Sequence, residues 1–360
     1  MPYFTKRPGN DREIKNLQIY SILRNKKEVS RADLTAITGI NPVSISNYTN
    51  IFIKNGLIIE KEIGLSSGGR PPIMLQLNNA GAFSIGIHVK FNQTQCVVMS
   101  SNMSIQKKFS IEGTDDQISK NIKAIVDTVL ESISKDQIKN VFVVIENSDN
   151  AQESLAQIEK EISFPVYLCD ASAAGAYNEK LREKIVDDNE SFIFSYNDTG
   201  MCTFVKGERF FSEEDASDNE VYRYLSAWNK DLSIVSCANR VIRNNVDSKL
   251  RSLEKLNEMS VYEAAKDGDP LAVEILEFVG LTLSVRLSYL INMLKPNKII
   301  IDGVLSNGQN VFLEGIKKGI KTLACNNNID MADINYGEND PFSIAIGTAG
   351  LGIRETFIGG

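Results

Sequence analysis

The N-terminal part of the chain has apolar residues at helical spacing, interrupted by residues that stop helices. From Asp11 the apolar positions recur three or four residues apart, which predicts a helix that ends in the polar run 24–27 (RNKK). Ser30 is a favourable N-cap and Gly39 is a favourable C-terminal stop, so a short second helix is expected over residues 31–38.

A third helix is predicted to begin at Asn41, a good N-cap, with Pro42 as its first residue. It runs to Asn55, and Gly56 ends it. The apolar residues expected to pack inward are Val43, Ile45, Tyr48, Ile51 and Phe52. The small and amide side chains expected to face outward near its N-terminus are Ser44, Ser46, Asn47 and Asn50. A short helix, a turn containing glycine and a second helix are typical of the helix-turn-helix, whose second helix enters the major groove of DNA.

Two strand-like segments follow this helix, at residues 57–61 and 74–77. A turn of sequence GLSSGGRPP joins them over residues 64–72, so the pair is predicted to form a hairpin with a wing at its tip. Glycine permits close approach of the backbone, and Arg70 beside Gly69 suits a contact with the minor groove or a phosphate. The residues leave one alternative open, a small helical cap with an ordinary turn.

The predicted winged helix contains few cations for phosphate binding. The third helix holds only Lys54, so phosphate contacts are expected mainly from Lys26, Lys27, Arg31, Arg70 or the pair Lys6 and Arg7. The candidate DNA-binding residues are Arg31, Asn41, Ser44, Ser46, Asn47, Asn50, Lys54, Gly69 and Arg70. This set predicts double-stranded DNA as the partner.

The charge of the chain divides at the end of this module. The whole sequence has 39 basic and 46 acidic residues, a net charge of −7 that alone argues against a nucleic-acid partner. Residues 1–79 contain 11 basic and 6 acidic residues, net +5, and the remaining residues contain 28 and 40, net −12. The basic end is therefore the end predicted to meet DNA. Hydrophobic residues at 42% and charged residues at 24% exclude a largely disordered chain.

After Asn79, short β-like runs alternate with helical segments, which is the pattern of an α/β, multidomain protein. Strands are expected at residues 83–89, 95–100, 104–111, 141–145, 166–169, 191–195, 201–206 and 298–301, and helices at 118–133, 170–184, 271–294, 310–324 and 341–356. The five cysteines are far apart with no CxxC pair, which predicts neither a disulfide framework nor a zinc site. Neither a membrane span nor a secretory signal is predicted, so a cytoplasmic protein is expected.

Five segments follow one another in a recognisable order. They are residues 68–71 (GGRP), 84–88 (SIGIH), 170–179 (DASAAGAYNE), 292–303 (NMLKPNKIIIDG) and 346–351 (IGTAGL). With them, nearly the whole chain resembles the ROK family of sugar kinases and related repressors. The resemblance implies a winged helix-turn-helix over residues 1–79 and an actin-like, ribonuclease H-like ATPase body over residues 80–360. Its two lobes are expected at about residues 80–185 with 341–360, and at 186–340.

The residues that kinases of this family use for phosphoryl transfer are replaced in this chain. The first phosphate-binding loop, Asp-x-Gly-Gly-Thr in those kinases, corresponds to residues 88–92 (HVKFN), which lack glycine. The catalytic aspartate corresponds to Ala171, which cannot accept a proton. After Gly207, where many members bind zinc, the sequence has no cluster of His and Cys. The resemblance thus implies no catalysis, no cofactor and no metal.

The leading hypothesis is a transcriptional regulator, expected to repress carbohydrate-related genes as a homodimer. Its body is expected to sense a sugar or sugar derivative through Asp170, Ser172 and Asp198. Two alternatives stay open: a sugar kinase with Asp170 as its base and Asp198 near the metal, and a scaffold that binds a protein partner. His88, the only histidine, is interpreted as structural in preference to a pH sensor or an anion site.

Overall fold

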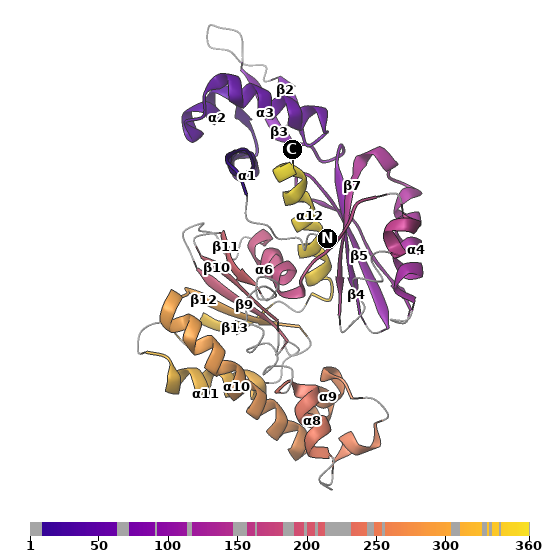
Figure 1. The fold of residues 1–360 in the computed structure, drawn as a ribbon, viewed down its shortest axis with the longest axis vertical. Helices are drawn as coiled ribbons and strands as arrows, with labels where there is room; N and C mark the ends of the chain where they lie inside the picture. Colours follow the sequence, from indigo (N-terminus) through magenta and orange to yellow (C-terminus); the bar gives the residue numbers. More distant parts are fainter. Residues whose placement is uncertain are drawn as a thin grey trace. The chain divides into compact units, whose positions relative to one another are not determined.

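The structure is a computed structural model of the 360-residue chain (Figure 1). It describes residues 9–62, 72–90, 92–113, 117–146, 157–162, 164–182, 191–197, 200–205, 208–212, 232–242, 248–253, 256–303, 310–325, 330, 333–337 and 340–359. Contacts within the chain divide it into two compact units, Met1–Cys169 with Ile344–Gly360, and Asp170–Ser343. The first unit contains the predicted winged helix together with one lobe of the body.

Three helices begin the first unit, and a polar side chain caps the start of each. Asn10, Ser30 and Asn41 each accept a hydrogen bond from a backbone N–H in the first turn of the helix that follows. Gly39 ends the second helix in the left-handed conformation, with a φ of 70°. The helices are α1 (Asp11–Lys26), α2 (Arg31–Thr38) and α3 (Pro42–Lys54). The predicted bounds of the second and third helices are confirmed to within one residue.

A small antiparallel sheet completes this module. Its strands are β1 (Val29–Ser30), β2 (Ile58–Glu62) and β3 (Ile73–Leu77), in the order β1-β3-β2. β2 pairs with β3 along its whole length, which confirms the predicted hairpin. β1 is absent from the predicted elements, because two residues are too few to show an alternating pattern. The tip of the hairpin, with Gly69 and Arg70, lies outside the described residues.

A five-stranded mixed sheet forms the lobe of the first unit. Its order is β6-β5-β4-β7-β8, with β4, β5 and β6 antiparallel and with β7 and β8 parallel to β4. The bounds are β4 (Phe83–Val89), β5 (Gln93–Ser100), β6 (Ile105–Glu112), β7 (Ile138–Ile145) and β8 (Val166–Leu168). Helix α4 (Ile118–Leu130) buries Ile122, Ile125 and Val129 against one face of this sheet. Helix α12 (Ser343–Gly359) crosses the other face, as Figure 1 shows.

The sheet of the second unit has the same topology, in the order β11-β10-β9-β12-β13. Its strands are β9 (Phe192–Tyr196), β10 (Gly200–Val205), β11 (Glu208–Ser212), β12 (Lys298–Asp302) and β13 (Ile334–Tyr336). Its helices are α6 (Ala171–Leu181), α8 (Ile234–Ile242), α9 (Glu258–Lys266), α10 (Pro270–Leu294) and α11 (Asn310–Leu323). Apolar side chains of α8 to α11 and of β9, β12 and β13 form one buried core. Two sheets of equal topology confirm the predicted two-lobed α/β body.

The contact-based boundary between the units falls between Cys169 and Asp170, whereas the sequence places residues up to about 185 in the first lobe. Helix α6 accounts for the difference, because it packs on β9 and β10 of the second unit. β11, β13, α8 and α9 are absent from the predicted elements. β13 is only three residues long, and the other three are interspersed with polar residues that weaken the sequence pattern.

Candidate nucleic-acid interface

Helix α3 has one exposed row of side chains along its length, which we term the α3 row. Its members are Val43, Asn47, Asn50 and Lys54, and all four are exposed. Spacings of four, three and four residues place them on one face of the helix. The row begins with an aliphatic side chain, continues with two amides and ends with a cation. Such groups suit contacts with base edges near the helix N-terminus and with a phosphate near its C-terminus.

Val43 is 71% exposed, so the prediction that it packs inward is wrong. The buried residues of α3 are Ile45, Thr49 and Phe52. Val43 lies two residues before Ile45, about 200° around the helix, and therefore faces solvent. Thr49 holds the core position between Ile45 and Phe52. A polar residue at that position obscures the periodicity in the sequence.

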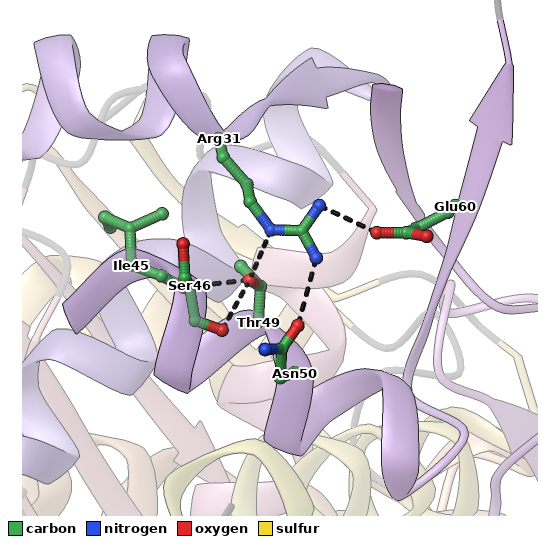
Figure 2. Close-up of polar contacts among 6 residues, drawn as sticks. All are labelled: Arg31, Ile45, Ser46, Thr49, Asn50 and Glu60. Carbon is green, nitrogen blue, oxygen red and sulfur yellow. Dashed lines mark hydrogen bonds and ion pairs between the residues drawn. The ribbon is translucent and has the colours of Figure 1, made fainter. Parts of the chain in front are cut away.

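Arg31, the first residue of α2, joins α2, α3 and β2 through three hydrogen bonds (Figure 2). Its Nε donates to Thr49 Oγ1 at 3.1 Å, its Nη2 to Asn50 Oδ1 at 3.1 Å and its Nη1 to Glu60 Oε1 at 2.7 Å. Thr49 Oγ1 in turn donates to the carbonyl of Ile45 at 2.8 Å. Arg31 therefore fixes α3 against α2. Its contact with a phosphate stays a prediction.

The other predicted DNA-binding residues have different local roles. Asn41 caps α3, because its Oδ1 accepts the N–H of Ser44 at 2.9 Å. Ser44 and Ser46 are half-buried beside the α3 row. Gly69 and Arg70 lie outside the described part of the chain. The structure thus brings Arg31 and Asn50 together, and it leaves Asn47 and Lys54 exposed on the same face.

The C-terminal helix α12 supports the winged helix from within the first unit. The Phe357 ring stacks on Tyr20 of α1 with centroids 4.3 Å apart, and it meets Phe52 of α3 edge to face at 5.2 Å. Asn16 Nδ2 donates to the carbonyl of Ile358 at 3.1 Å, across a separation of 342 residues. No local sequence pattern could indicate a contact between residues so far apart.

Two residues expected to bind an effector stabilise the start of α6. Asp170 is the N-cap of this helix, and its Oδ1 accepts the N–H of Ala173 at 2.9 Å and the hydroxyl of Ser172 at 2.5 Å. Ser172 is buried. Asp198 lies outside the described residues. The role of these three residues in binding an effector stays a prediction.

His88 lies at the end of β4, where the resemblance places the first phosphate-binding loop of the kinases. The ring is fully buried, and its Nε2 lies 2.7 Å from Glu146 Oε1. This pair agrees with the structural interpretation of His88. Within the described ranges, no three side chains of His, Cys, Asp or Glu gather as metal ligands do. Among the helices that the structure describes, none combines the length and apolarity that a membrane span requires.

Comparison with known proteins relates the chain to one family. Residues 235–354 match the model of the ROK family. This chain contains a ROK family domain. The resemblance found in the sequence is thereby confirmed. The xylose repressor of Bacillus spizizenii is 23% identical to this chain over 365 residues, which cover 90% of this chain and 91% of that protein. The DNA-binding transcriptional dual regulator NagC of Escherichia coli is 19% identical over 350 residues, 87% of this chain and 86% of that protein.

Solved structures of ROK family proteins share the fold. A ROK family transcriptional regulator, a homologue of the Escherichia coli MLC protein, aligns with a TM-score of 0.67 at 18% identity and covers 96% of each chain. A ROK family glucokinase from Streptomyces griseus aligns with a TM-score of 0.53 at 16% identity, over 75% of this chain and 99% of that chain. The predicted fold, a winged helix followed by an actin-like body, is confirmed.

Proposed function

We propose that this ROK family chain is a sugar-responsive, DNA-binding transcriptional repressor. The observation that carries the proposal is the α3 row, an exposed face of amides and a cation on the second helix of a helix-turn-helix. Relatives that match most of the chain are named repressors for xylose and for N-acetylglucosamine. A regulator that acts on DNA belongs in the cytoplasm, and this is the location we propose.

We also propose that the body does not catalyse phosphoryl transfer. Ala171 offers no base, and the neighbouring Asp170 uses its Oδ1 to cap α6. At the end of β4, His88 is buried against Glu146 where a kinase needs open glycine backbone. The body is left with the role of sensing an effector, for which Asp170, Ser172 and Asp198 are our candidates.

Selection of duplex DNA from a random pool by the full-length protein tests the proposed function. The protein is expected to enrich one sequence, and a sugar such as xylose or N-acetylglucosamine is expected to release it. A coupled kinase assay with the same sugars and ATP is expected to show no turnover. The proposal fails if the protein retains no DNA at low salt, or if it phosphorylates a sugar.

Lys54 is expected to contact a phosphate, because it is the exposed cation at the C-terminal end of the α3 row. Each phosphate contact contributes about 0.9 to the slope of log affinity against log salt concentration. Lys54→Ala in the full-length protein should therefore reduce this slope by about 1. Lys123→Ala removes an exposed lysine from α4 and serves as the control. Equal slopes for the two variants would contradict a phosphate contact at Lys54.

We further propose that the protein forms a homodimer through α10, since a helix-turn-helix protein contacts two half-sites as a symmetric pair. Phe278, Tyr289 and Met293 are 50%, 70% and 75% exposed, and their spacing places them on one face of α10. Other exposed apolar residues of the same unit are Leu323 at the end of α11, Leu253 and Met259. Isolated apolar residues are common on surfaces, but a row of large ones favours a protein contact.

The double variant Tyr289→Lys and Met293→Lys is expected to be a monomer, because two ammonium groups would be buried in the proposed contact. Sedimentation velocity at micromolar concentration measures this shift from dimer to monomer. Glu263→Lys changes the net charge by the same amount at an exposed position of α9 and is expected to stay dimeric. A double variant that remains a dimer, or a native protein that is a monomer, would rule out α10 as the contact.

A further inference from the structure

The four residues of the α3 row differ in whether their polar groups already form hydrogen bonds within the protein. A guanidinium carries only N–H donors, so the Asn50 atom that Arg31 contacts at 3.1 Å is the oxygen Oδ1 (Figure 2). Arg31 is itself held by Thr49 and Glu60. The amide of Asn50 is therefore fixed in orientation, and the group it has to offer to DNA is the donor Nδ2. Phosphate oxygens and the N7 and O6 atoms of guanine are acceptors that suit this donor.

The amide of Asn47, unlike that of Asn50, is not held by another side chain that the structure describes. It is exposed, and in the part of the chain that the structure describes neither end of its amide has a hydrogen-bond partner in the protein. An asparagine with both ends available can make the paired contact with adenine, in which Oδ1 accepts from N6 and Nδ2 donates to N7. Asn47 also lies in the N-terminal half of α3, the part of a recognition helix that contacts base edges.

Val43 adds an apolar surface one turn earlier on the same face. The side chain is 71% exposed in the first turn of α3 and has no polar group to offer. In the major groove, the apolar partner for such a side chain is the C5-methyl group of thymine. Four helical residues span about 6 Å, and base pairs are about 3.4 Å apart, so the thymine and the adenine would lie within about two base pairs of each other.

We infer that Asn47 and Val43 determine the base preference of α3: Asn47 contacts an adenine through N6 and N7, and Val43 contacts the methyl group of a thymine within two base pairs. Asn50, positioned by Arg31, and Lys54 hold the helix in the groove through donors alone. This inference rests on the proposed function, because it names the bases that the same surface contacts.

Base analogues in the DNA, combined with alanine variants of the protein, test this inference. The probe is the duplex enriched from the random pool by the full-length native protein. Thymines are replaced one at a time by uracil, which removes the methyl group, and adenines one at a time by 7-deazaadenine, which removes N7. For the native protein, one uracil is expected to lower affinity about fourfold. One 7-deazaadenine within two base pairs of it is expected to lower affinity at least about fivefold.

Each variant should cancel the effect of its own analogue. Val43→Ala is expected to bind the thymine and uracil probes equally, and Asn47→Ala to bind the adenine and 7-deazaadenine probes equally. Both side chains are exposed, so neither change is expected to alter folding. Lys54→Ala is the matched control from the same row, and it should weaken all probes by one common factor.

The outcomes separate this inference from the proposed function. In one outcome, the native protein enriches a sequence, but each variant loses the same factor of affinity from its own analogue as the native protein does. The inference is then overturned and the proposed function stands. If no analogue position affects the native protein, the inference is likewise overturned. If no sequence is enriched from the pool, the proposed function fails and the inference fails with it.

Discussion

Full-length protein that carries Phe357→Ala is expected to unfold at a lower urea concentration, with its free energy of unfolding reduced by about 3 to 5 kcal/mol. Phe357 is fully buried, and its ring contacts Tyr20 of α1 and Phe52 of α3. Truncation removes both ring contacts and leaves a cavity between α12 and the winged helix, which cannot close without moving α3. Circular dichroism during urea titration measures the loss.

The same substitution is expected to weaken DNA binding, although Phe357 belongs to α12 and not to the α3 row. Phe52 lies on the buried side of the helix that carries this row, so loss of its partner loosens the helix that must enter the groove. Phe357→Leu keeps part of the side-chain volume and should show smaller losses of both stability and affinity. An unchanged urea midpoint for Phe357→Ala would show that α12 does not support the winged helix.

Local signals in the sequence were enough to locate the helices of the winged helix. Ser30 and Asn41 cap their helices through bonds that span three residues, and Gly39 ends α2 through its own backbone conformation. Each of these features depends only on neighbouring residues. Periodicity was less reliable for side-chain direction, since Val43 faces solvent and Thr49 takes the core position.

Contacts between distant segments could not be predicted in this way. The sequence predicts that Arg31 contacts a phosphate, and only the fold shows that its guanidinium donates hydrogen bonds to Asn50 and Glu60. In the sequence, Phe357 is one apolar residue among several in a C-terminal helix. In the structure, its ring packs against Tyr20 and Phe52 in the core of the winged helix, at the other end of the chain. In the body, the strand runs were sufficient to predict an α/β protein, and the two lobes followed from the resemblance to the ROK family. The assignment of α6 to the second unit depended on its packing against β9 and β10.

Gly86→Ala is expected to cost about 3 kcal/mol in the free energy of unfolding. Gly86 lies in β4, where α12 crosses the sheet. A Cβ at this position would lie 2.3 Å from the backbone nitrogen of Ala349 and 2.4 Å from the carbonyl oxygen of Ala345. Both colliding atoms belong to the backbone of α12, so no rotation of a side chain relieves the overlap. The helix must move away from the sheet, and its Phe357 end moves from the winged helix with it.

A matched control for Gly86→Ala exists on α12 itself. Gly359→Ala adds the same methyl group at a position with nothing within 4 Å, so it should change stability by less than about 1 kcal/mol. Ala349→Gly is not expected to rescue Gly86→Ala, because it leaves the colliding backbone nitrogen in place. Urea titration of Gly86→Ala, of Gly359→Ala, of Ala349→Gly and of the double variant Gly86→Ala with Ala349→Gly measures these differences in unfolding free energy. Rescue by Ala349→Gly, or equal losses of unfolding free energy for Gly86→Ala and Gly359→Ala, would show that the close approach of α12 to β4 does not require glycine at position 86. The connection from the sheet through α12 to the winged helix would then depend on the aromatic contacts of Phe357 alone.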